Sequence, residues 1–149
     1  MYKSNSPPAS MAHEDEMGVN APFIHQRTIA QLTAGLYPLY RSGKIPFEPL
    51  PEMMLTEGYA TPVPDVLLYD YEAEQTRVII EICQTSGQKR DLTKIIKLID
   101  EELYGILEGF VYNYKTSEWF RYRKGDGGLT ENSSISEILQ LDLNSFLIG

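Results

Sequence analysis

The sequence predicts a single α/β domain in which helices flank a mixed central sheet. The patterns run along the chain in the order helix, strands, helix and hairpin, which is typical of a sheet packed against helices. One predicted strand is apolar at nearly every position, as is usual for a strand covered on both faces. With 149 residues, 42% of them hydrophobic, the chain is long enough for one substantial core.

The first 21 residues are polar, contain Pro and Ser, and show no apolar period. Residues 1–21 are therefore predicted to be a flexible N-terminal arm, and residues 22–149 the folded domain. A helix is predicted from about Phe23 to Tyr40, and Pro38 should kink or end it. Its apolar residues recur at helical spacing: Ile24, Ile29, Leu32, Leu36 and Leu39. Residues 44–55 (KIPFEPLPEMML) are interrupted by prolines, which suits an edge strand or an irregular connection.

Two neighbouring strands are predicted next, PDVLLYDY (64–71) and TRVIIEIC (76–83). A helix follows over residues 86–105, with Gly105 as its C-terminal stop. Its buried stripe is predicted to be Leu92, Ile95, Ile96, Ile99 and Leu103. Residues 108–114 and 117–123 form an aromatic-rich hairpin, with one face in the core and the other open to bases or a partner subunit. Residues 133–147 should form one or two short helical turns.

Asp65 and Glu81 are the strongest candidate site residues. Asp65 opens the first of the two neighbouring strands, and Glu81 lies near the end of the second. Two carboxylates at the ends of adjacent strands can hold a divalent cation such as Mg²⁺, which prefers oxygen ligands. The alternative is that both are solvated residues at strand ends, which are frequent in proteins.

A series of short motifs resembles the bacterial Uma-type family of restriction-endonuclease-like proteins, which belongs to the PD-(D/E)XK nuclease superfamily. The series begins with Pro22 and His25-Gln26 at a helix start, then the Pro-Asp strand and the strand that carries Glu81. It continues with Arg-Asp-Leu (90–92) before a lysine-bearing helix, then two aromatic strands and the closing LDLNSFL. The resemblance covers roughly residues 22–147. It implies a restriction-endonuclease-like core in which Asp65 and Glu81 bind Mg²⁺ or Mn²⁺.

The catalytic lysine of the superfamily is missing from its usual place. That place is two residues beyond the glutamate, where this chain has Cys83, which we interpret as a small buried hydrophobe. In the resembled family a lysine on the following helix takes the role, which favours Lys94. A helical wheel places Lys94 about 200° from Leu92, on the solvent side, and Lys89 only about 60° away. Geometry therefore favours Lys89, and both lysines stay candidates; the alternative is that they are part of a solvated helix face.

Further polar residues border the predicted site. The resemblance implies that His25 and Gln26 orient a water or a phosphate, although packing at the helix start is the simpler interpretation. Gln84, Thr85 and Ser86 could contact a phosphate, but a helix N-cap is the more common role of such residues. The family's acidic N-terminal strand pair has no counterpart in this chain.

Two functions from different classes remain open. The first is a metal-dependent nuclease that hydrolyses DNA, with Asp65, Glu81 and either Lys94 or Lys89 as catalytic residues. The second is a catalytically inactive nuclease fold that acts as a binding or assembly module. A net charge of −8 counts against tight DNA binding, which normally rests on basic residues. The single cysteine favours a reducing cytoplasm, no segment predicts a membrane span, and the superfamily resemblance suggests a homodimer.

Overall fold

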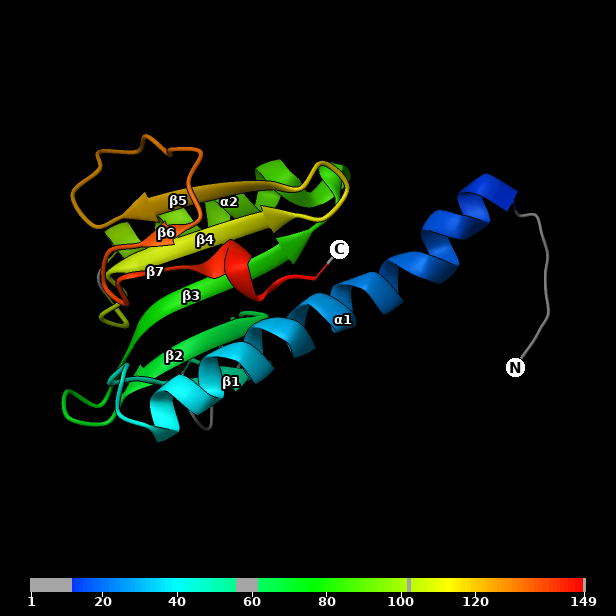
Figure 1. Ribbon diagram of the computed structural model, residues 1–149. Coiled ribbons are helices and arrows are strands. Elements are labelled where there is room, and N and C mark those ends of the chain that lie inside the picture. Colours follow the sequence, from blue (N-terminus) through cyan, green and yellow to red (C-terminus); the bar gives the residue numbers. More distant parts are fainter. Residues whose placement is uncertain (1–11, 56–61, 102, 149) are drawn as a thin grey trace.

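The computed structural model describes residues 12–55, 62–101 and 103–148. Its centre is a five-stranded mixed sheet in the order β1-β2-β3-β4-β5 (Figure 1). Strands β3 and β4 are parallel, and the other neighbouring strands are antiparallel. The strands of this sheet are β1 (Glu48–Pro51), β2 (Val66–Asp70), β3 (Gln75–Cys83), β4 (Glu108–Asn113) and β5 (Glu118–Arg123). The predicted α/β class with a mixed sheet and flanking helices is confirmed.

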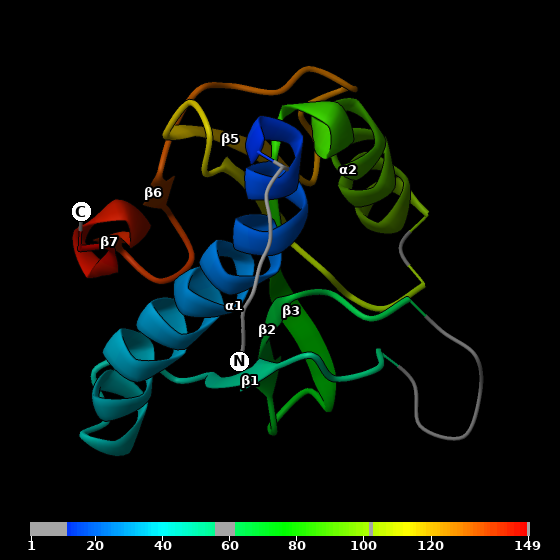
Figure 2. The same cartoon turned by 90° about the vertical axis from the view of Figure 1, so that its right-hand side faces the viewer.

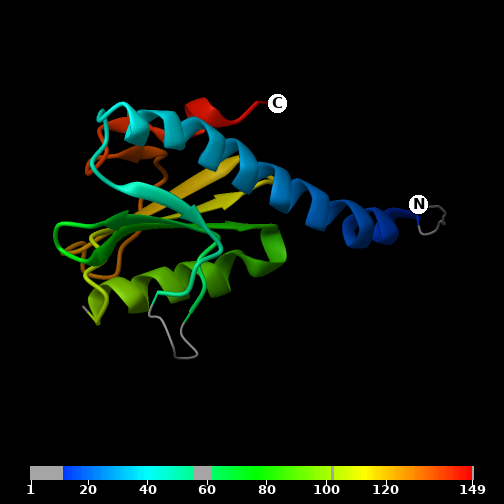
Figure 3. The same ribbon diagram turned by 90° about the horizontal axis from the view of Figure 1, so that it is seen from below.

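One helix covers each face of the sheet. Helix α1 (Ala12–Arg41) crosses one face and helix α2 (Thr85–Asp100) packs on the other, as the view from below shows (Figure 3). The apolar residues accordingly form two clusters, one on each face. Alternate residues of β3 divide between them: Ile80 lies in the α1 cluster, whereas Ile79 lies in the α2 cluster. The nearly continuous apolar run in β3 therefore reflects burial on both faces, as predicted.

Helix α1 is longer than the sequence predicts. It begins at Ala12 rather than near Phe23, and it continues through Pro38 to Arg41. Pro38 cannot donate a backbone hydrogen bond, but its carbonyl still accepts one from the Ser42 N–H at 3.0 Å, so the helix continues to Arg41. The first turns of α1 lie within the predicted arm, and the division of the chain at residue 21 stays a prediction.

The predicted limits of α2 need two corrections. The helix ends at Asp100, and Gly105, with a φ of 77°, lies beyond it in the connection to β4, against Gln75. Leu103 is outside the helix and 70% exposed, so its predicted place in the buried stripe is wrong. Leu98 is buried instead, one position away from Ile99. Leu92 and Ile96 are only partly buried, so the buried face of α2 is turned from the predicted stripe towards Asp91 and Leu98, and it ends one turn earlier.

The C-terminal segment forms a small strand pair and a short helix rather than helical turns alone. Strand β6 (Ile135–Ser136) pairs with β7 (Leu141–Asp142), and the 3-10 helix η1 (Leu143–Phe146) follows. This segment lies beside α1 at the rim of the sheet (Figure 2). Gly35 makes the close approach possible, because a Cβ there would overlap the Phe146 ring. No helix in the described part of the chain has the length and apolarity needed to cross a bilayer.

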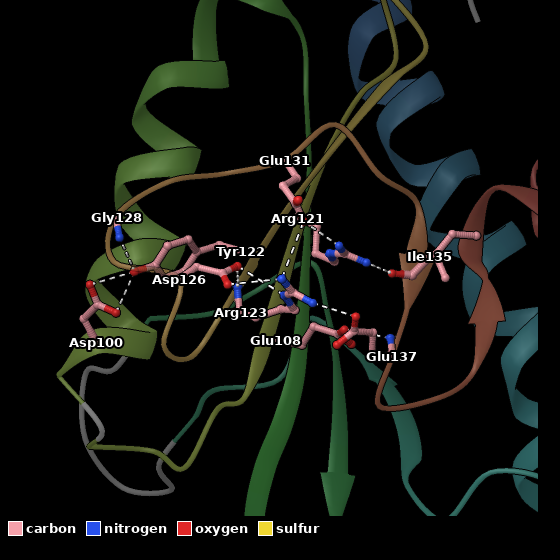
Figure 4. A network of polar contacts seen from close by, with 10 residues as sticks. All are labelled: Asp100, Glu108, Arg121, Tyr122, Arg123, Asp126, Gly128, Glu131, Ile135 and Glu137. Carbon is pink, nitrogen blue, oxygen red and sulfur yellow. Dashed lines mark hydrogen bonds and ion pairs between the residues drawn. The ribbon is translucent and has the colours of Figure 1, made fainter.

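A polar network fastens the segment between β5 and β6 to the sheet (Figure 4). The buried Glu108 carboxylate accepts hydrogen bonds from Ser136 Oγ at 2.6 Å and from the Glu137 N–H at 2.8 Å. Arg121 donates to the Ile135 carbonyl at 2.9 Å and pairs with Glu131 at 2.6 Å. Glu108, Arg121 and Ser136 are buried, and their contacts fix the C-terminal segment against β4 and β5.

Candidate active site

The sheet register brings Asp65 and Glu81 together. Val66, the first residue of β2, pairs with Ile80 of β3, so Asp65 comes opposite Glu81. Directly opposed residues of antiparallel strands have Cβ atoms about 5 Å apart. The predicted adjacency of the two strands is confirmed. Both carboxylates lie at the end of the sheet where β3 finishes.

Asp65 bridges the sheet and helix α1. Its Oδ2 accepts a hydrogen bond from the Ile82 N–H at 2.7 Å, so the side chain extends the ladder where the β2 backbone has ended. The same oxygen lies 3.1 Å from Nε2 of His25. This contact raises the pKa of His25, mainly through the hydrogen bond from its ring to Asp65. His25 therefore borders the site, whereas Gln26 turns to Glu52, 3.4 Å away.

Glu81 is buried and paired with Lys94. Only 4% of Glu81 is exposed, and Lys94 Nζ lies 2.8 Å from its Oε2. The wheel-based prediction that Lys94 points to solvent is wrong. The Lys94 side chain is long enough to lie along the helix flank and to place its charged end on the sheet. Lys89, which the wheel favoured, is exposed.

The surroundings of Glu81 disfavour a negative charge on its carboxylate. Burial is the largest cause that raises the pKa of Glu81 to about 7, and the charges of Asp65 and Asp91 raise it further. Lys94 acts in the opposite direction through its hydrogen bond and its charge. Near neutral pH the Glu81 carboxylate is thus poised between its charged and neutral forms.

Asp91 is a residue of the cluster that the sequence reasoning missed. It lies in the second turn of α2, is 8% exposed, and its nearest cation is Arg90, 3.7 Å away. Burial and the Asp65 charge raise its pKa. A signal was present in the sequence, because Asp91 precedes the buried Ile95 by four residues and so lies on the same helix face.

Cys83, two residues beyond Glu81, is buried, as predicted. It packs in the cluster on the α2 face with Ile79 and Ile95. Burial is the main cause that raises the pKa of its thiol to about 12. Cys83 therefore stays neutral and contributes no charge to the site.

The start of α2 is held by a residue of β4 rather than by its own cap. Gln84 makes no side-chain cap hydrogen bond, so capping by Gln84 itself is not observed. The buried Asn113 instead donates to Thr85 Oγ1 at 3.2 Å and to Gln88 Oε1 at 2.7 Å. Its own carbonyl oxygen accepts from the Lys115 and Thr116 N–H groups. Asn113 thereby fixes α2, and with it Lys94, relative to the sheet.

A cavity of about 400 Å³ adjoins the cluster. His25, Cys83 and Asp91 line it, together with Arg90 and Tyr114. A second cavity of about 430 Å³ lies between α1, the β4–β5 hairpin and the C-terminal segment, and Tyr114 lines it as well. The candidate site is therefore open to a ligand on the side of the α2 start.

Asp65 and Glu81 suit a cation such as Mg²⁺ that keeps several water ligands better than a cation whose ligands all come from the protein. The described residues contain no group of three or more His, Cys, Asp or Glu side chains arranged to hold a metal. Asp65 and Glu81 each use only one carboxylate oxygen in the hydrogen bonds and ion pairs described above. Mg²⁺ commonly binds through one or two carboxylates, several waters and a substrate phosphate, which these two residues fit.

The sequence matches no protein-family model, and no curated protein matches it. A solved structure from Anabaena variabilis, described as a "putative nuclease belonging to DUF820", has a similar fold. The two superpose with a TM-score of 0.62 at 15% sequence identity, over 82% of this chain and 79% of the other. At that identity the likeness establishes a nuclease-like fold, and the chemistry has to be argued from the site.

Proposed function

We propose that the protein is a metal-dependent nuclease that hydrolyses phosphodiester bonds in DNA. The observation that carries the proposal is the meeting of Asp65, Glu81 and Lys94 at one end of the sheet, with Lys94 2.8 Å from Glu81. The lysine comes from α2, while the superfamily position in β3 holds a neutral cysteine. The ammonium group of Lys94 on α2 would thus take the role of a lysine at the Cys83 position of β3.

Each residue has a distinct role in this proposal. Asp65 and Glu81 would hold Mg²⁺ or Mn²⁺, which when bound polarises the phosphate and lowers the pKa of a bound water. Lys94 orients the attacking water and stabilises the negative charge that develops on the phosphate oxygens. His25 holds Asp65 in place through their 3.1 Å contact. The exposed Lys89 takes no part.

The fold likeness supports this proposal, since the Anabaena protein is itself described as a "putative nuclease". One observation favours the alternative of an inactive binding or assembly module. The net charge of −8 provides no broad cationic face for duplex DNA. A cytoplasmic location and a homodimer are part of the proposal and rest on the sequence alone.

A nicking assay with Mg²⁺ or Mn²⁺, on supercoiled plasmid and on circular single-stranded DNA, tests the proposal. We expect wild type to nick DNA. The variants Asp65→Ala, Glu81→Gln and Lys94→Met should be slower by about a hundredfold or more, which is the usual contribution of a general acid–base or electrostatic group to catalysis. Lys97→Met is the matched control, since Lys97 lies on the same helix but is 71% exposed and meets Glu101 only at 4.0 Å.

Calorimetric titration with Mn²⁺ separates metal binding from chemistry. Asp65→Ala should lose binding, whereas Lys94→Met should keep it, because the ammonium competes with the cation for Glu81. Absence of metal binding and nicking by the folded wild type would refute the nuclease and leave the binding module.

A further inference from the structure

Two cavities share a wall residue, and the first of them adjoins the candidate site. The first is bounded by His25, the end of β3 and the start of α2 with Arg90. The second follows the next stretch of α1, where Arg27 lines it, towards Asn144 in the C-terminal segment. Tyr114 belongs to the walls of both. At about 400 and 430 Å³, the cavities are in the size range of small-molecule sites and each holds roughly one nucleotide.

Tyr114 is fixed between the cavities. It directly follows β4, and its N–H donates to the Cys83 carbonyl at 3.0 Å, which anchors it to the end of β3. The ring is half-buried and packs against the core on the α1 face. Its hydroxyl makes no hydrogen bond with any described residue. A ring held in this way can stack on a base at little cost in conformational entropy.

Each cavity has one arginine that is available to a phosphate. Arg27 is exposed and forms no ion pair within the described residues. The Arg90 side chain is 79% exposed, and its ion pair with the adjacent Asp91 is long, at 3.7 Å. These two charges can neutralise two phosphates of a bound strand. They cannot supply the wide cationic surface that a duplex requires on a protein of net charge −8.

We propose that a single strand of DNA lies along the two cavities, with Tyr114 stacked between successive bases and Arg27 and Arg90 on the phosphates. This inference rests on the proposed function and names its substrate class, because the first cavity adjoins the Asp65 and Glu81 cluster. Concave sites of one-nucleotide size, separated by an aromatic ring, accept unpaired bases. Paired bases of a duplex are stacked on one another and cannot enter them.

Fluorescence anisotropy with a labelled single strand, and with the duplex of the same sequence, tests the inference. The buffer contains EDTA, so that binding is measured without cleavage. We expect wild type to bind the single strand more tightly than the duplex. Tyr114→Ala should bind at least about fivefold more weakly and Tyr114→Phe like wild type, since stacking needs only the ring. Arg27→Ala should weaken binding and lower the salt slope by about 0.7, the value for one phosphate on a single strand.

Lys97→Ala is the charge-matched control, because Lys97 lines neither cavity. Thermal melting shows whether Tyr114→Ala is folded. If it is not, the binding of the single strand by Tyr114→Leu and by Arg27→Ala, a change at an exposed residue, tests the inference instead. Duplex binding as tight as single-strand binding, or wild-type affinity of the Tyr114 and Arg27 variants, overturns the inference. If the protein binds the single strand but nicks no DNA, the single-strand inference is supported and the nuclease proposal is refuted. If it nicks duplex DNA and the Tyr114 and Arg27 variants nick it equally well, the nuclease proposal is supported and the single-strand inference is overturned.

Discussion

Glu81 shows at the scale of one residue how a candidate catalytic group costs stability. Its carboxylate is buried beside two other acidic side chains, and one ammonium group opposes them. The folded-state pKa is about 7, above the usual value of 4.5, so the folded protein holds this proton more tightly than the unfolded chain. As the pH rises from 4.5 to about 7, the unfolded chain has already released this proton while the folded protein still holds it, so the free energy of unfolding falls.

We therefore expect Glu81→Gln to be more stable than wild type at pH 8 and close to wild type at pH 5. The amide resembles the protonated acid in size and removes the buried charge. Urea unfolding of both proteins at pH 5 and pH 8 gives the difference in their free energies of unfolding. Asp91 and Glu108 are present in both proteins, so the change of this difference with pH reports on Glu81. A variant less stable than wild type at pH 8 would show that the Lys94 pair outweighs burial.

At the scale of the element, the position of α2 depends on Gly109 in β4. A Cβ at this residue would lie 3.0 Å from Ile99 Cδ1 and 3.2 Å from Ile95 Cβ. The missing side chain lets the helix approach the sheet closely. Asn113 fixes the start of the same helix through Thr85 and Gln88. Together these residues set how far Lys94 reaches over Glu81.

Gly109→Val should destabilise the protein by about 1–3 kcal/mol, the usual cost of overpacking a core. It should also lower nicking, since α2 moves away and carries Lys94 with it. Gly109→Ala is the graded control and should have a smaller effect on both, because it adds one carbon. Urea unfolding gives the stability, and the plasmid assay gives the activity. Full activity in a folded Gly109→Val protein would mean that Lys94 tolerates the displacement.

At the scale of the whole molecule, the sheet has its candidate site at one end, and the polar network of Figure 4 joins β4 and β5 to the segment that follows β5. Arg121 is 8% exposed and joins β5 to Glu131 and to the Ile135 carbonyl. It holds the connection that leads to β6, β7 and η1. That C-terminal segment in turn packs on α1 and contributes Asn144 to the second cavity.

Arg121→Met should destabilise the protein by about 2 kcal/mol, the order of a buried hydrogen bond to a charged group. Limited proteolysis should then cut the segment after β5 sooner than in wild type. Glu131→Gln is the comparison, and a smaller effect is expected because the Glu131 side chain is 56% exposed. Equal losses in the two variants would place the stabilisation in the ion pair rather than in the bond to Ile135.

The sequence was sufficient for the strands and for the adjacency of Asp65 and Glu81. Alternation and burial patterns are local, so β2, β3, β4 and β5 lie within a few residues of the predicted ranges. Asp65 and Glu81 face one another because adjacent strands leave little choice of register. Helix ends were predicted less well, since α1 tolerates Pro22 and Pro38 and α2 stops before Leu103.

The partners of the site residues were decided only by the tertiary structure. A helical wheel describes Cβ directions, but whether Lys94 reaches solvent or Glu81 depends on how α2 lies across β3 and on the length of the side chain. Asp91 joined the cluster, and Tyr114 came between two cavities, through contacts between segments far apart in the chain. Local sequence determines the element and the face of each residue, whereas packing between elements determines which charged groups meet.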